Sequence, residues 1–353
     1  MVDIFGLCMG DQQVTTLKDI AKESNRSVAT ISMALADHPK ISKKTKQNIL
    51  RISQKLGYKP PRERMRSLSS VARSCSLKRI GFFLMGDPHH HDVYPTILHA
   101  LAANASSLGI RFEMASHDPA QADTAVEKML AFAKGVDGMI VTGYIREDMI
   151  GVLVGRAIPH VVIGHYSHDT AERVSAKANV VDYDYLAMGK LAVEYLARQG
   201  HTRIGFVCET LPEGLYYYRW LEGYRLGLAN LNLPQEDSLI HVAGKSLVGG
   251  GPAAEAFAAQ KNPPTAFLVP EVRTASSFIH TMKMLGFSVN EKNIVVASTT
   301  ELIEKYNLKD YPLISFSGEW LAIAALRQLI HISETPLPFP TELYVPFTTN
   351  MLD

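Results

Sequence analysis

Hydroxyl and basic side chains are concentrated between residues 15 and 58, near the start of the chain. Serine and threonine hydroxyls cap helices and contact phosphate oxygens, and lysine and arginine neutralise phosphates. Residues 14–78 hold 15 Lys and Arg but 4 Asp and Glu, a net charge of +11, while the rest of the chain carries −10. The total of +1 hides this asymmetry. A basic head on an acidic body favours binding to a polyanion, because phosphate contacts release cations from the duplex.

Three short helices are predicted to position these groups. Thr16 begins the first with a capping-box pattern, Ser27 begins the second after a turn centred on Asn25, and Ser42 begins a third that ends at Gly57. The outline is that of a DNA-binding helix-turn-helix, and the alternative is an ordinary three-helix bundle, against which the charge argues. The predicted core comprises Ile20, Ala21, Ile31, Leu35, Ile41, Ile49 and Leu56.

After Lys78 the chain alternates between short apolar runs and amphipathic runs. This alternation predicts doubly wound parallel sheets, and roughly 275 residues are enough for two such lobes facing each other across a cleft. The carboxyl ends of parallel strands are where such folds bind small ligands. Strands are expected at 79–84, 111–115, 138–142, 160–163, 204–208, 266–269, 294–297 and 313–316, and helices at 97–108, 122–133, 185–199, 219–231 and 274–285.

The predicted fold is therefore an all-α helix-turn-helix head joined to an α/β body, a pair of lobes like those of periplasmic binding proteins. We expect a head at 14–60, a hinge at 61–78 and the body at 79–353. The hinge begins with two prolines and is rich in Ser and Arg, which suits a segment that orders on DNA, although a plain linker is the alternative. The expected first lobe comprises about 79–183 and 313–335, and the second about 184–312 and 336–353.

Several classes of protein are disfavoured. No run of about 18 apolar residues suggests a membrane span, and the N-terminus does not read as a signal peptide. Cys8, Cys75 and Cys208 are scattered, which fits the reducing cytoplasm. The three histidines at 89–91 could bind a metal, but adjacent loop residues cannot easily face one ion, so loop histidines or pocket lining is favoured. The Gly-rich stretch 249–252 lacks the Lys-Ser/Thr of a phosphate loop and suggests a flexible connection. We expect no cofactor and no enzymatic activity.

The combination of head, hinge and body resembles the lactose-repressor (LacI/GalR) family of transcription regulators. The head carries the resemblance most strongly, in TLKDIAKESNRSVATISMAL at residues 16–35. Weaker matches follow in family order along the body, at 181–184, 200–205, 223–224, 264–266 and 340–346. The resemblance implies a homodimer that binds a palindromic DNA operator and responds to a small molecule.

The resemblance implies that the helix from Ser27 to Ala36 enters the major groove of DNA. Val28 and Ala29 match the residues that read base edges, but they can only contact thymine methyl groups or allow close approach. Met33 replaces the family's usual Arg. Leu17, Ser27, Thr30, Ser32 and Tyr58 match positions that contact or orient the phosphate backbone, with helix capping or local packing as the alternative.

The resemblance also assigns residues to the hinge and to the ligand site. Leu68 is expected to wedge into the minor groove, with Met65 as the second candidate. In the ligand site, Trp220 stands where the family has an Arg, which leaves Arg219 one residue earlier. The expected ligand contacts are Tyr94, Arg219, Trp220, Glu271, Thr299 and Trp320. For each aromatic residue among them, packing in the core is the alternative.

We therefore expect a DNA-binding transcriptional regulator, a repressor, controlled by a sugar or sugar derivative bound between the lobes. The alternative is a solute-binding protein of a transport system, built on the same body. Steep salt dependence of DNA binding distinguishes the two hypotheses.

Overall fold

The computed structural model describes residues 17–24, 26–27, 30–31, 34, 42–55, 76–86, 93–164, 178–209, 215–244, 249–337 and 339–351. The chain divides into two compact units, Met1–Ser67 and Leu68–Met351. The predicted cap at Thr16, the turn at Asn25, the histidines at 89–91 and most of the predicted hinge lie outside the described residues.

The first unit contains α1 (Leu17–Ser24) and α3 (Lys43–Lys55). These helices share a core with two residues between them, Ile31 and Ala34. Four residues of the predicted core are confirmed as buried, and Leu35, Ile41 and Leu56 lie outside the described residues. The buried side chains of the head are Ile20, Ala21, Ile31, Ala34, Ile49 and Ile52.

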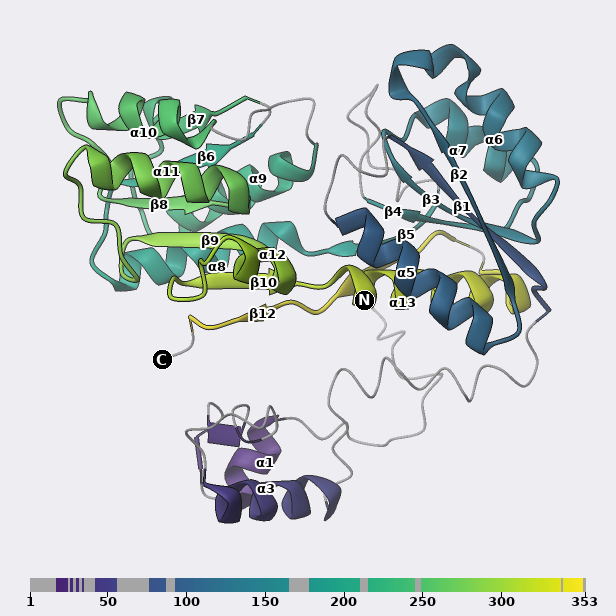
Figure 1. Cartoon of the computed structure of the whole chain (residues 1–353), viewed down its shortest axis with the longest axis horizontal. Helices are drawn as coiled ribbons and strands as arrows, with labels where there is room; N and C mark the ends of the chain where they lie inside the picture. The colour runs from purple at the N-terminus through teal and green to yellow at the C-terminus, as the bar shows by residue number, and fades with distance from the viewer. Residues whose placement is uncertain are drawn as a thin grey trace. The chain divides into compact units, whose positions relative to one another are not determined.

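The second unit contains two α/β lobes, each built on a six-stranded sheet (Figure 1). The first sheet has the order β11-β5-β4-β3-β1-β2, and all its neighbouring strands are parallel. Its strands are β1 (Arg79–Met85), β2 (Arg111–His117), β3 (Gly138–Gly143), β4 (His160–Ile163), β5 (Asn179–Tyr183) and β11 (Glu342–Val345). Helices α5 (Val93–Ser107), α6 (Ala125–Ala133), α7 (Glu147–Gly155) and α13 (Gly318–Glu334) pack against it.

The second sheet has the order β12-β10-β9-β8-β6-β7, in which β12 alone pairs antiparallel to its neighbour. Its strands are β6 (Ile204–Cys208), β7 (Ile240–Val242), β8 (Ala266–Val269), β9 (Ile294–Thr299), β10 (Leu313–Phe316) and β12 (Thr348–Thr349). The helices of this lobe are α8 (Tyr185–Arg198), α9 (Leu215–Asn230), α10 (Gly250–Ala258), α11 (Val272–Met284) and α12 (Thr300–Lys305). The predicted fold class, a helix-turn-helix head with two parallel-sheet lobes, is confirmed.

The C-terminal part of the chain is shared between the sheets differently from the predicted lobe boundaries. The segment 313–335 was expected in the first lobe, but β10 pairs in the second sheet while α13 packs on the first. The segment 336–353 was expected in the second lobe, but β11 pairs with β5 of the first sheet. Strand pairing is a long-range choice, so local sequence pattern identifies a strand without identifying its sheet.

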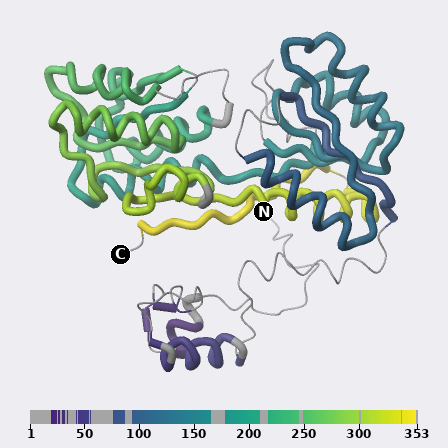
Figure 2. Tube along the Cα trace, viewed as in Figure 1, coloured from purple at the N-terminus to yellow at the C-terminus, as the bar shows by residue number. Residues whose placement is uncertain are grey.

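Close helix packing explains Gly250, one of the glycines at 249–251 that were predicted to form a flexible connection. Gly250 instead begins α10, and a Cβ there would lie 2.0 Å from the carbonyl oxygen of Thr274 in α11. The Gly250 N–H also donates to Ser277 Oγ at 3.1 Å. The prediction was wrong because a glycine that permits helix contact has the same sequence signature as a flexible one. Figure 2 shows the trace of α10 and α11 lying side by side.

No helix in the described part of the chain is both long enough and apolar enough to cross a bilayer.

Candidate nucleic-acid interface and ligand-binding strand ends

The second helix of the head begins at a side-chain cap. The backbone N–H of Thr30 donates to Ser27 Oγ at 3.1 Å, and the two hydroxyl oxygens lie 2.9 Å apart. The N–H of Ile31 donates to the carbonyl oxygen of Ser27 at 3.1 Å. The predicted N-cap at Ser27 is therefore confirmed, and it leaves the exposed start of this helix suited to contact an anion.

The third helix begins in the same way as the second. Thr45 N–H donates to Ser42 Oγ at 3.2 Å, and the Ser42 and Thr45 hydroxyl oxygens are 2.9 Å apart. The head thus carries two Ser-x-x-Thr caps. Each hydroxyl pair offers polar atoms beside a helix N-terminus, where the helix dipole favours a phosphate.

The head carries exposed cations on and beside its helices. Lys22, Arg26, Lys44 and Arg51 are exposed on the head. Lys55 of α3 pairs with Glu23 of α1 at 3.2 Å, an exposed ion pair that links the two helices. Cations of this kind neutralise duplex phosphates irrespective of sequence.

The residues expected to read bases, and those expected to wedge into the minor groove, stay predictions. Leu17 begins α1, but its side chain is outside the described residues. The other predicted DNA contacts that lie outside the described residues are Val28, Ala29, Ser32, Met33, Tyr58, Met65 and Leu68.

In the first lobe, the predicted ligand residue Tyr94 lies on α5 and hydrogen-bonds to Thr142 near the carboxyl end of β3. Burial, and secondarily the nearby Tyr144, raise the pKa of Tyr94 to about 12, while the Thr142 hydrogen bond opposes the shift. The hydroxyl is therefore neutral at ordinary pH. A neutral phenol can both donate and accept a hydrogen bond.

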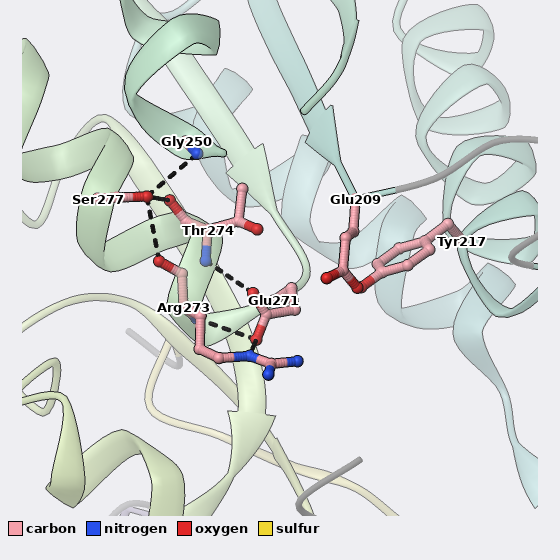
Figure 3. Close-up of polar contacts among 7 residues, drawn as sticks. All are labelled: Glu209, Tyr217, Gly250, Glu271, Arg273, Thr274 and Ser277. Carbon is pink, nitrogen blue, oxygen red and sulfur yellow. Dashed lines mark hydrogen bonds and ion pairs between the residues drawn. The ribbon is translucent and has the colours of Figure 1, made fainter. Parts of the chain in front are cut away.

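In the second lobe, Glu271 serves as the N-cap of α11 (Figure 3). Its carboxylate accepts from the backbone N–H groups of Arg273 at 3.0 Å and Thr274 at 2.7 Å. Arg273 Nε also lies 3.2 Å from Glu271 Oε1. Both carboxylate oxygens are thus engaged by the helix start, which favours a capping role for Glu271 over the expected ligand contact.

The two predicted residues of α9 have different surroundings. The Trp220 side chain is fully buried, and its ring packs against Tyr185 with centroids 5.9 Å apart. This burial favours the packing alternative for Trp220. Arg219 is mostly buried and pairs with Glu222 at 3.4 Å.

The remaining predicted ligand residues follow strands β9 and β10. Thr299 is buried, ends β9 and stands at the N-cap of α12 without a side-chain cap hydrogen bond. Trp320 lies in the first turn of α13, and its backbone N–H donates to Ser317 Oγ at 3.4 Å. Thr299 at the end of β9 and Trp320 after β10 therefore lie near carboxyl strand ends, where a ligand is expected in this fold.

Sequence reasoning missed Glu209, which directly follows β6. The Tyr217 hydroxyl donates to Glu209 Oε2 at 3.2 Å, and among the described residues no cation pairs with this carboxylate. Strand β6 is hydrogen-bonded to β8, so Glu209 and Glu271 follow neighbouring strands, as Figure 3 shows. The missed signal was an acidic residue immediately after a predicted buried strand. Across the described residues, no group of three or more His, Cys, Asp or Glu could hold a metal ion.

Two family models match the chain. Residues 16–61 match the model described as bacterial regulatory proteins, lacI family, and residues 193–306 match a periplasmic binding protein-like domain. These two segments correspond to the predicted head and to the larger part of the second lobe.

Curated relatives extend over most of the chain. Catabolite control protein A of Priestia megaterium is 26% identical over 290 residues, which cover 81% of this chain and 83% of the relative. The transcriptional repressor CytR of Escherichia coli K12 is 24% identical over 283 residues, which cover 79% of this chain and 78% of CytR.

Solved structures share the fold. A complex of the transcriptional regulator CelR with cellobiose has a TM-score of 0.64 at 17% identity, covering 95% of this chain and 98% of that one. A lac repressor dimer bound to operator and an anti-inducer has a TM-score of 0.65 at 18% identity, covering 96% of this chain and 98% of that one.

Proposed function

Because this chain belongs to the lacI family of bacterial regulatory proteins, we propose that it represses transcription as a homodimer whose two heads bind a palindromic operator. A small molecule held by the two-lobed body controls this binding. The chain is a DNA-binding transcriptional regulator, and we propose that it acts in the cytoplasm. A dimer suits the task, since one helix-turn-helix contacts too few base pairs for useful specificity.

One observation carries this proposal: the capped start of the helix at Ser27 stands on a small basic head. The cap fixes the helix start through Thr30, and the core residue Ile31 anchors the same helix against α1 and α3. Arg26, which directly precedes the cap, is exposed. A fixed helix N-terminus beside a cation is a suitable contact for the DNA backbone.

The small molecule is proposed to be a neutral, hydroxyl-rich compound of the carbohydrate class. At the carboxyl end of the second sheet, Glu271 is engaged by α11 and Arg273, whereas Glu209 accepts from Tyr217 and pairs with no cation among the described residues. A carboxylate accepts hydrogen bonds from two hydroxyls and repels an anion. The relative CelR, solved with cellobiose, has a ligand of this class.

Control requires that the molecule bind one arrangement of the lobes more tightly than another. A change in the lobes of both subunits then moves the two heads out of register with the two half-sites. The coupling is reciprocal, so operator DNA changes the affinity for the small molecule by the same factor.

The DNA-binding half of the proposal is tested by salt titration of the full chain on labelled duplex DNA. We expect the logarithm of the binding constant to fall linearly with the logarithm of salt concentration, and Arg26→Ala to reduce the slope by about 1. Lys261→Ala, which removes an exposed cation from the body, is the matched control and leaves the slope unchanged. Binding without salt dependence, or equal slopes for both variants, contradicts the proposal.

The ligand half is tested by calorimetry with neutral saccharides, cellobiose among them, and with their phosphorylated counterparts. We expect Glu209→Gln to weaken the best neutral ligand about tenfold, which corresponds to about 1.4 kcal/mol. Glu255→Gln, an exposed carboxylate on α10, is the control. Tighter binding of the phosphorylated compound, or an unchanged affinity in Glu209→Gln, overturns the assignment.

A further inference from the structure

The chain passes between the two lobes of the body at three short crossovers. These lie between β5 and α8, between β10 and α13, and between β11 and β12. In the first crossover, Tyr183 ends β5 of the first sheet and Tyr185 begins α8 of the second lobe. In the second crossover, Ser317 separates β10 of the second sheet from α13, which packs on the first.

A single buried hydroxyl joins the first two crossovers. Tyr183 Oη donates to the carbonyl oxygen of Ser317 at 2.6 Å and accepts from the N–H of the same residue at 2.8 Å. The Tyr183 side chain is 1% exposed. One hydroxyl thus satisfies both backbone groups of a residue 134 positions away, at the point where the chain changes lobe.

The crossovers are also packed together by aromatic rings. The Tyr183 ring lies 5.4 Å from that of Phe316, and 6.1 Å from that of Tyr185. Burial is the main cause that raises the pKa of the Tyr183 hydroxyl above its ordinary value. The hydroxyl therefore stays neutral, which it must be to donate and accept at once.

We propose that Tyr183 and the backbone of Ser317 form an interlobe pin, which holds two crossovers together and thereby restricts the angle between the lobes. A change in lobe angle must rotate the chain at these crossovers, and the pin ties their backbones at one point. Buried hydrogen bonds with two well-placed partners resist such displacement more than exposed ones do. The role of the pin in DNA regulation rests on the proposed function, but its effect on lobe motion does not.

The chain provides a matched control in Tyr224. Its hydroxyl donates to the carbonyl oxygen of Ile204 at 2.7 Å, and the side chain is 1% exposed. Both groups belong to the second lobe, since Tyr224 lies on α9 and Ile204 begins β6. Tyr224→Phe removes the same atom from an equally buried site without touching a crossover.

The proposal is tested by measuring lobe separation with spin labels at Lys134→Cys and Lys261→Cys, without ligand or DNA. Cys8→Ser and Cys75→Ser remove two other thiols, and the buried Cys208, whose thiol pKa burial raises to about 12, resists labelling. Labelled chain is diluted with unlabelled chain so that distances within one subunit dominate. We expect Tyr183→Phe to broaden the distance distribution and Tyr224→Phe to leave it as in the parent.

Amide hydrogen exchange supplies the second measurement. We expect the Ser317 N–H to exchange roughly five- to tenfold faster in Tyr183→Phe, because its acceptor is removed. An unchanged distance distribution, or an unchanged exchange rate at Ser317, in Tyr183→Phe overturns the pin. Since no DNA or ligand is present, failure here is distinct from failure of the proposed function.

Discussion

The two lobes of the body share one topological plan with one difference at its edge. Five strands of the first sheet have the order β5-β4-β3-β1-β2, and five of the second have the equivalent order β10-β9-β8-β6-β7. The sixth strand differs, because β11 pairs parallel to β5 whereas the short β12 pairs antiparallel to β10. Two lobes of one plan are therefore completed by a single C-terminal segment that contributes to both.

The side chains at the carboxyl ends of the strands differ between the two lobes more than the strand orders do. Near the carboxyl end of β3, the first lobe places the neutral side chains of Tyr94 and Thr142, and charged side chains follow its strands at Asp118 and Arg146. The second lobe presents charged groups, represented by Glu209 after β6 and Glu271 after β8. A shared fold thus positions different side chains in the two lobes, and Glu209 of the second lobe is expected to set the charge preference for the ligand.

The largest expected effect concerns helix contact in the second lobe. In Gly223→Ala, the new Cβ on α9 would lie 2.2 Å from the carbonyl oxygen of Leu186 on α8. Because backbone cannot yield cheaply, we expect a loss of about 3 kcal/mol in the free energy of unfolding, measured by urea denaturation of the full chain.

The control for that prediction lies in the first lobe. Gly151 on α7 has open space around the position of a Cβ, so Gly151→Ala is expected to stabilise by about 0.5–1 kcal/mol through helix propensity. Equal changes in the free energy of unfolding for Gly223→Ala and Gly151→Ala would show that close helix contact does not explain the glycine at position 223.

A smaller effect is expected from the cap of α11. Glu271→Ala removes the acceptor for two backbone N–H groups, and should destabilise the second lobe by about 1–2 kcal/mol. Glu271→Asp keeps a capping carboxylate and should retain most of the stability. If ligand affinity is lost in Glu271→Asp while stability is retained, Glu271 contacts the ligand directly and the capping role is secondary.

The smallest expected effect is a change of stability with pH, and each lobe contains a carboxyl group whose pKa is lowered near the start of a strand. Asp137 accepts from the N–H groups of Lys78 and Arg79 at the start of β1, and these hydrogen bonds hold its pKa below the ordinary value. In the second lobe, the Arg203 side chain beside the start of β6 lowers the pKa of Glu236. A carboxyl whose pKa is lowered by folding stabilises the folded state above its unfolded pKa, and that contribution is lost as pH falls through the folded value.

We therefore expect the melting temperature to fall on acidification below about pH 4, with a shallower fall in Asp137→Asn. Thermal scans across this range, with Glu236→Gln in parallel, compare the two lobes directly. A parallel fall in the parent and in Asp137→Asn would mean that this anchor contributes nothing to acid sensitivity.

Local signals in the sequence identified most of the sheet strands, but they missed β5, β7, β11 and β12 and did not identify which strands pair. Caps such as Ser27 and apolar runs such as that of β6 depend on near neighbours, so they could be predicted. The sheet to which β10 belongs depends on long-range pairing. The Tyr183–Ser317 contact joins residues far apart in the chain, and no local pattern indicates it.

Dimeric operator binding can be tested by selecting bound sequences from a random pool of duplex DNA with the full chain. We expect enrichment of a palindrome whose half-sites are about one helical turn apart, or a multiple of it, because two heads of a dimer bind it together. The enriched site should be bound at least about a thousandfold more tightly than random duplex at physiological salt. A pool that shows no enrichment, or that yields only single half-sites, would mean that this protein is not a dimeric operator-binding regulator.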